Sequence, residues 1–368
     1  SPSNSMATAR IDLGFVNDDC DTRLLQGLYF PSKVGGKPAW LSLNPIPKTE
    51  QLSCPRCNNP LVFLLQVYSP RDKTEEDAFH RTLFLFVCRN SACSTPNDAS
   101  NFKVFRSQLP RMNQFFSSDP PPDDPADEIG PAPSAQKYQP LCEVCGCIGP
   151  KQCSQCKSVS YCCKDHQTLH WKAGHKKACG KQVSHDSEDP SSCGVLFPEL
   201  ELEIEEETCS QEKSTKDETE ASQEYQQYAE NINTGQSGSG LGDLYSEQDL
   251  EGMAAQETDD DRIFKKFKKR VAQNEEQVLR YSKGGEPLWV SSDHQAKQED
   301  IPVCSCGAPR QFEFQVMPQL LNHLGVDEKE GNSLDWGTLC IFTCRDSCAI
   351  GNNYTEEFVW KQDFSADR

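Results

Sequence analysis

The feature that most constrains this chain is the segment 142–179, which is crowded with cysteine and histidine. Two thiolates in a C-x2-C turn can reach one metal ion, and a gap of three residues places two ligands on one face of a helical turn. Four such pairs supply two tetrahedral sites, closed either by adjacent pairs or by alternating ones. The pairs are Cys142 with Cys145, Cys153 with Cys156, Cys162 with His166, and His175 with Cys179.

A segment this short cannot bury enough apolar surface to fold unaided. We therefore predict two structural zinc ions, each contributing an apparent ~10–16 kcal/mol to folding. A disulfide framework and ordinary buried cysteines are the alternatives. Catalysis at these sites is not expected, because a catalytic zinc keeps one position open and here the protein fills every position.

The same segment resembles a MYND-type zinc finger. The resemblance implies alternating pairs and a module that binds short proline-containing peptides without doing chemistry. It leaves Cys147, Cys163 and His170 outside both sites. The matching residues are Tyr161-Cys162, His166-Gln167, Trp171 and His175-Lys176-Lys177-x-Cys179. The implied ligands are Cys142, Cys145, Cys162 and His166 for one zinc, and Cys153, Cys156, His175 and Cys179 for the other.

The whole chain, with 368 residues, is long enough for two or three domains. It holds 20 cysteines, yet we see no signal-peptide pattern and no apolar run long enough for a membrane span. We expect reduced thiols and metal sites in the cytoplasm and nucleus. Met6 resembles a natural start, and residues 1–5 an added extension.

The negative charge is concentrated in one tract. The net charge is −19, but residues 186–261 hold 23 Asp and Glu against two Lys, a net of −21, so the rest sums to +2. The finger region 137–181 holds eight Lys against Glu143 and Asp165, a net of +6. The tract is either a solubilising linker or a cradle for a basic partner.

The N-terminal region reads as a β-rich unit. Runs of β-forming residues at 61–68, 80–88 and 102–108 predict three strands. Two pairs of cysteines flank the first two strands, in the layout of a zinc ribbon. The predicted ligands are Cys54, Cys57, Cys88 and Cys93.

The C-terminal region repeats the N-terminal one, which predicts a duplicated unit. The pattern Gly-Gly-x-Pro-x-Trp ends at Trp40 and again at Trp289, and four further matches follow in the same order. These matches pair Gln66 with Gln315 and Gln108 with Gln362. They also predict a second four-cysteine zinc site, although its first pair has only one intervening residue, and they assign Cys340 to strand packing. The predicted ligands are Cys304, Cys306, Cys344 and Cys348.

Three further segments carry weaker patterns. Residues 117–140 are rich in Pro and Asp and indicate a linker, with a peptide ligand as the alternative. In 197–205 apolar residues alternate with Glu, which predicts a strand docked on a sheet edge. Residues 208–256 are predicted to be disordered. Residues 259–270 place three acids before a basic cluster and predict a helix whose apolar stripe runs on to Tyr281. The basic cluster either rims that packed helix or contacts nucleic acid.

The predicted fold class is α+β, mainly β: a duplicated, zinc-stabilised β-rich unit whose halves pack together, with an inserted MYND finger and a disordered acidic linker. The predicted divisions are an N-terminal half-unit at 6–118, a linker at 119–137, the finger at 138–181, the acidic tract at 182–258 and a C-terminal half-unit at 259–368.

The segments GGKPAWL, LVFLLQVY, FLFVC, EFQVMPQLL and YTEEFVWKQD, in this order around the finger, resemble the programmed cell death protein 2 family over 11–363 apart from the linkers. The resemblance implies a non-catalytic zinc protein of the nucleus and cytoplasm. It implies a chaperone or adaptor for a newly made small-subunit ribosomal protein, supporting subunit assembly and cell proliferation. Ribosomal proteins are basic, so the acidic tract fits such a client.

Three other functions are the alternatives. The finger could recruit Pro-rich peptides of nuclear corepressors, which would make the chain a transcriptional adaptor with a role in cell-death regulation. An enzyme is not expected, because we find no G-x-G-x-x-G, phosphate loop or H-E-x-x-H. Direct DNA binding through the lysine-rich finger is opposed by the overall negative charge.

Overall fold

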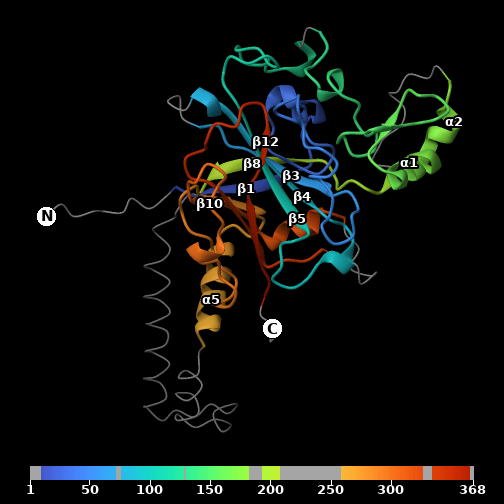
Figure 1. Cartoon of the computed structure of the whole chain (residues 1–368). Helices are drawn as coiled ribbons and strands as arrows, with labels where there is room; N and C mark the ends of the chain where they lie inside the picture. Colours follow the sequence, from blue (N-terminus) through green and yellow to red (C-terminus); the bar gives the residue numbers. More distant parts are fainter. Residues whose placement is uncertain are drawn as a thin grey trace, which may run out of the picture.

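The computed structural model describes residues 10–71, 76–127, 130–181, 193–207, 258–325 and 334–364. Its main element is one large antiparallel sheet, with the finger at one side of the molecule and the helix α5 (Asp259–Val271) at another (Figure 1). The mainly β fold class is therefore confirmed. The acidic residues 208–257, predicted to be mostly disordered, lie outside the described residues.

The sheet has eleven strands in the order β12-β5-β4-β3-β2-β8-β1-β9-β10-β11-β13. The predicted strands at 61–68, 80–88 and 102–108 are β3, β4 and β5. The bounds are β1 (Asp12–Asn17), β2 (Lys33–Val34), β3 (Val62–Tyr68), β4 (His80–Val87), β5 (Phe102–Leu109), β8 (Leu200–Glu206), β9 (Leu279–Tyr281), β10 (Arg310–Val316), β11 (Thr338–Cys344), β12 (Tyr354–Glu356) and β13 (Phe358–Gln362).

The finger contains the small ribbon β6 (Lys151–Gln152) and β7 (Ser160–Tyr161), followed by helical turns α1 (Lys164–His170), η7 (Trp171–His175) and α2 (Lys176–Ala178). Short 3-10 helices connect the other elements. They are η1 (Thr22–Leu25), η2 (Gly27–Tyr29), η3 (Glu76–Ala78), η4 (Ser91–Cys93), η5 (Pro125–Asp127), η6 (Ala135–Lys137), η10 (Gln298–Asp300) and η11 (Pro318–His323).

The strand order shows the duplication directly. The series β2-β3-β4-β5 on one side matches β9-β10-β11-β13 on the other, and the pair β8-β1 joins them. Both β3 and β10 carry a bulge at the same place, between Phe63 and Leu65 and between Phe312 and Phe314. A shared irregularity of this kind is a strong sign that the two halves are copies of one unit.

Two glutamines make the same clamp in both halves. The Gln66 Oε1 accepts from the Ala39 N–H at 2.9 Å, and the Gln315 Oε1 accepts from the Leu288 N–H at 2.6 Å. Each side-chain amide also donates back to the carbonyl of the same partner. Ala39 and Leu288 both precede the tryptophan of the Gly-Gly-x-Pro-x-Trp pattern, so the repeated Gln fixes the repeated turn.

The register corrects one pairing predicted from the repeats. Thr82 pairs with Ser107 in the first half, and its counterpart Thr338 pairs with Gln362 in the second. Gln362 thus matches Ser107, not Gln108. A shift of one residue moves every side chain to the opposite face. As a result Trp360 matches Phe105, a position that the sequence comparison assigns to Val359.

The two ends of the sheet meet. The β12 strand comes from the C-terminal half but pairs with β5 of the N-terminal half, whereas β13, which follows β12 in the chain, pairs with β11. Between them, the Glu357 N–H donates to the Val104 carbonyl at 2.9 Å. The sheet therefore folds back on itself, and apolar residues of both halves share its interior, including Leu85 and Ile341.

Two expectations for the joining segments were wrong. The strand predicted at 197–205 begins at Leu200 and joins the two halves of the sheet instead of docking on an outer edge. It pairs with β1 along its length and with β2 only at Leu200 and Glu201. The predicted helical stripe ends at Val271, because Tyr281 belongs to β9 and Val278 leads into it. The three acids do begin the helix, where Thr258 and Asp261 form a capping box.

Among the described residues, we find no helix with the length and apolar character to cross a membrane.

Candidate metal centres

The structure brings the sixteen predicted ligands together in four groups, with the same membership as predicted. Within each group the ligand atoms all lie within 4.8 Å of one another. A tetrahedral zinc with Zn–S bonds of ~2.3 Å requires S···S distances of ~3.8 Å. Pairs such as Cys57 with Cys88 at 3.6 Å and Cys304 with Cys348 at 3.7 Å fit this requirement. The groups indicate zinc binding.

A common turn presents the first pair of ligands in each group. The N–H of residues 58, 146 and 157 donates to the carbonyl of the first cysteine of its pair, and each of these residues has positive φ. In the fourth group the turn is one residue shorter, and Gly307 (φ 88°) donates to Cys304. The unusual C-x-C spacing is thus the same turn with one residue removed.

The two finger groups combine alternating pairs. The Cys145 and Cys162 sulfurs lie 3.7 Å apart, with the His166 Nδ1 3.1 Å from the Cys162 Sγ. In the other group the His175 Nε2 lies 3.5 Å from the Cys156 Sγ. The alternating arrangement follows from the fold, since Ser160 of β7 pairs with Cys142, which brings Cys162 and His166 back to the first turn.

The residues left over in the finger have other contacts. Cys147 is buried, and its thiol donates to the Cys145 carbonyl at 3.8 Å. Cys163 caps α1, where its sulfur accepts the His166 N–H at 3.4 Å. The buried His170 ring lies 2.9 Å from the Tyr161 hydroxyl.

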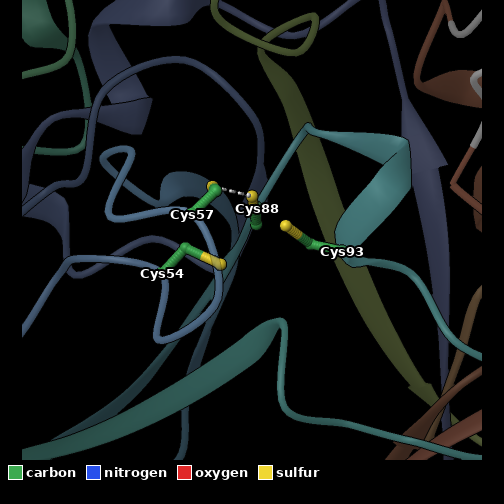
Figure 2. A group of neighbouring side chains, drawn as sticks. All are labelled: Cys54, Cys57, Cys88 and Cys93. Carbon is green, nitrogen blue, oxygen red and sulfur yellow. Dashed lines mark hydrogen bonds between the residues drawn. The ribbon is translucent and has the colours of Figure 1, made fainter.

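In the N-terminal half, Cys54 and Cys57 come from the turn before β3, Cys88 follows β4, and Cys93 ends η4. Figure 2 shows the four side chains converging with their sulfurs inward. The long separation between the two pairs is spanned by the antiparallel strands β3 and β4, which return the chain to its starting point.

In the C-terminal half, the fourth group is attached to the opposite half of the molecule. The Arg106 guanidinium of β5 donates to the Cys348 carbonyl at 3.0 Å and to its Sγ at 3.4 Å. Cys306 in this group is exposed. Cys340, by contrast, is buried inside β11, as the repeat predicted.

All cysteines in the described residues are free thiols, which removes the disulfide alternative. Burial raises the pKa of the Cys57 thiol, but the Asn59 backbone and neighbouring thiols outweigh it and lower the pKa to about 7. In the same way, burial is outweighed by hydrogen bonds from the backbone and from neighbouring side chains, which lower the pKa of Cys156 to about 6 and that of Cys304 to about 7. In the same groups burial raises the pKa of Cys93 and of Cys179 to about 11. One thiol in each group therefore reaches the metal-binding thiolate form more readily than its neighbours.

Buried ion pairs between the halves were missed from the sequence. Arg81 of β4 and Glu313 of β10 are fully buried and bonded at 2.8 Å, and Glu357 bonds both Arg106 and Arg310 at 2.7 Å. Burial raises the pKa of Glu313, but the facing Arg81 outweighs it and holds the pKa well below its usual value. The available signal was Glu313, a charged residue flanked by two phenylalanines in the sequence of β10.

The finger packs on the N-terminal half. Trp40 is only 4% exposed, and its indole N–H donates to the Gly146 carbonyl at 2.9 Å. Buried Val144 and Tyr161 of the finger belong to the same apolar cluster as Phe84 and Phe86 of the sheet. The molecule is thus a duplicated β protein that carries a MYND-type finger and four cysteine-rich metal centres.

Family models match both halves of the sheet and the finger, while residues 193–207 with β8 lie outside the matched ranges. The N-terminal domain of programmed cell death protein 2 matches residues 10–123, its C-terminal putative domain matches 261–363, and the MYND finger matches 142–179. The chain therefore belongs to the programmed cell death protein 2 family.

Relatives span the full length. The chain is 47% identical over 358 residues to programmed cell death protein 2 of Bos taurus, with 96% of each chain covered. It is 30% identical over 348 residues to the human programmed cell death protein 2-like, covering 90% of each. A shorter match, 30% over 99 residues and 24% of each chain, is to a probable 20S rRNA accumulation protein 4 of Schizosaccharomyces pombe. No solved structure matches.

Proposed function

We propose that this chain is a non-catalytic adaptor or chaperone that binds a newly made, basic protein of the small ribosomal subunit. In this account it supports assembly of that subunit, and through it cell proliferation, and it works in the cytoplasm and the nucleus. The observation that carries the proposal is an acidic ridge on β8, formed by Glu201, Glu203 and Glu205.

A neutral side chain holds part of the ridge in place. The neutral Asn17 amide donates to Glu201 at 3.3 Å and to Glu203 at 2.7 Å, which orients both carboxylates without neutralising them. Burial first, and the charge of Glu203 second, raise the pKa of Glu201. Like charges held this close repel one another, so a cationic partner would be attracted and would relieve the repulsion.

The names of the relatives support the same proposed role in ribosome assembly. The fission yeast relative is named for accumulation of 20S rRNA, which suggests a role for this family in making ribosomes. None of the family names describes an enzyme. The metal groups also favour a structural role, because four protein ligands fill a tetrahedral site and leave no position for a substrate. Zinc is the metal that sets of Cys alone and of Cys with His usually bind.

The test is affinity capture of the full chain from cell lysate at low and high salt, followed by mass spectrometry. We expect one basic small-subunit protein to be enriched, and less of it at high salt because exposed charges are screened. The matched control is the double variant Glu203→Gln, Glu205→Gln, which keeps the shape of the ridge and should recover less client.

Recovery of no ribosomal protein at either salt concentration would contradict the proposal. Recovery of Pro-rich nuclear corepressors instead, abolished by Cys153→Ser, would support the transcriptional alternative. Under our proposal Cys153→Ser changes the finger but leaves β8 and its client contact in place.

A further inference from the structure

The sheet is interrupted beside β8. Strand β2 pairs with β8 only through Lys33 with Glu201 and Val34 with Leu200. Phe30 then takes a left-handed conformation (φ 49°), which turns the chain out of the sheet. No strand in the described part of the chain fills the space between the rest of β8 and the end of β3.

The interruption leaves backbone groups of β8 directed into the gap. The Glu207 N–H donates to the Ile11 carbonyl, whereas the Leu202 N–H donates to Ser32 on the opposite side. Backbone groups alternate between the two sides of a strand. The N–H and C=O of Ile204 and Glu206 must therefore face the gap, where no strand pairs with them among the described residues. Such an edge is a template for an added strand.

The gap is a cavity of about 770 Å³. Its inner lining is apolar and aromatic, and Ile204, which should be buried at this point of the sheet, is 37% exposed. The free part of β8 is about four residues long, or roughly 14 Å at ~3.4 Å per residue. The inner lining includes Phe30, Val67, Tyr68, Leu202, Ile204 and Tyr281, and the acidic rim is formed by Glu201, Glu203 and Glu205.

The negative charge of the rim distinguishes between the polypeptide segments that are candidates to fill the gap. The chain's own following segment, 208–257, holds eleven Asp and Glu against two Lys, a net of −9, and would be repelled. A second copy of the chain would bring the same acidic strand. A basic segment of a different polypeptide is the occupant that this rim attracts.

We propose that an extended segment of a partner polypeptide, with Lys or Arg alternating with small aliphatic residues, adds to β8 as a strand in this gap. The inference rests on the proposed function, since it names the place where a basic client is held. Side chains directly opposite one another lie on the same face. The basic residues would thus face Glu203 and Glu205, and the aliphatic ones would cover Ile204.

The first test uses a labelled six-residue peptide in which lysine and valine alternate, titrated into the full chain by fluorescence anisotropy. Its control has the same composition, with three lysines followed by three valines. We expect the alternating peptide to bind at least tenfold more tightly, because only alternation serves both faces. Equal affinities would mean attraction by charge alone and would overturn the proposal.

The second test removes the backbone donor at the centre of the gap. Ile204→Pro deletes an N–H that no described strand uses, and edge positions tolerate proline. We expect it to weaken the alternating peptide at least tenfold, while the matched Ile204→Val binds like the parent. Circular dichroism confirms that each variant is folded. If Ile204→Pro does not fold, Glu203→Gln with Glu205→Gln replaces it and should give the same loss.

The two proposals fail in distinguishable ways. If no ribosomal protein is captured from lysate but the alternating peptide binds and depends on Ile204, the proposed client is wrong and the docking site stands. If the client is captured equally well by Ile204→Pro and by the parent, the client stands and the docking site is wrong.

Discussion

The two halves of the sheet are copies that differ in how completely their outer face is buried. In the N-terminal half, the cluster around Trp40 is covered by the finger and is almost completely buried. In the C-terminal half, the equivalent cluster contains Phe312 and Phe342, and its Trp289 and Trp360 are only half-buried. The interior face, by contrast, is equally apolar in both halves.

This difference assigns the finger a structural role as the cover of one half. The Gly-Gly-x-Pro-x-Trp turn is the same in both copies, and so is its glutamine clamp. What distinguishes Trp40 is its bond to the Gly146 carbonyl and its edge-on contact with Tyr354, which comes from the other half. A repeated motif can thus be a buried anchor in one copy and a partly exposed surface in the other.

The largest expected effect separates the finger from the C-terminal metal group. Cys142→Ser should release one zinc, unfold the finger and uncover Trp40, because structural zinc contributes an apparent ~10–16 kcal/mol to modules of this size. Cys306→Ser should release one zinc and leave Trp40 covered. Hydrogen exchange around residues 36–46, measured by mass spectrometry, distinguishes the two variants, because it should be fast only where Trp40 is uncovered. Slow exchange there in Cys142→Ser would show that the finger is not the cover.

The second prediction compares the two tryptophans. Trp40→Ala removes a buried ring and should lower the free energy of unfolding by ~3–5 kcal/mol. Trp289→Ala removes a half-buried ring and should cost about 1–2 kcal/mol, since less apolar area returns to water. Urea unfolding of the full chain measures both. Equal losses would mean that the finger adds nothing to the burial of Trp40.

The smallest effect tests the symmetry itself. Gln66→Leu and Gln315→Leu each leave the backbone of one turn without its partner, which should cost ~1–3 kcal/mol. Because the clamps match, we expect the two losses to agree within about 1 kcal/mol. Gln66→Glu and Gln315→Glu keep the acceptor but bury a carboxylate, so each should cost more than the corresponding Leu variant. A large loss in one half alone would break the duplication argument.

Much of the architecture could be predicted from the sequence because cysteine spacing and β-forming runs are local signals. The second four-cysteine group, the packing role of Cys340 and the order of the repeats all followed from comparing the two halves of the sequence. These features depend on residues close to one another in the chain.

What could not be predicted depends on how distant strands meet. Arg81 finds Glu313 only after the sheet folds back on itself, and nothing near either residue in the sequence reports the partner. The one-residue difference in β13 is invisible to pattern matching, because Gln108 and Gln362 look equivalent until the strand pairing is known. The free edge of β8 likewise arises from the short β2 and the turn at Phe30.

The most direct test of the central claim is the number of zinc ions per chain, measured by native mass spectrometry and elemental analysis of freshly purified protein. The four groups of ligands predict four zinc ions per chain. We expect chelation to remove them together with the cooperative unfolding transition. Two zinc ions per chain, confined to the finger, with both halves of the sheet still folding cooperatively, would contradict the claim that metal holds the duplicated sheet together.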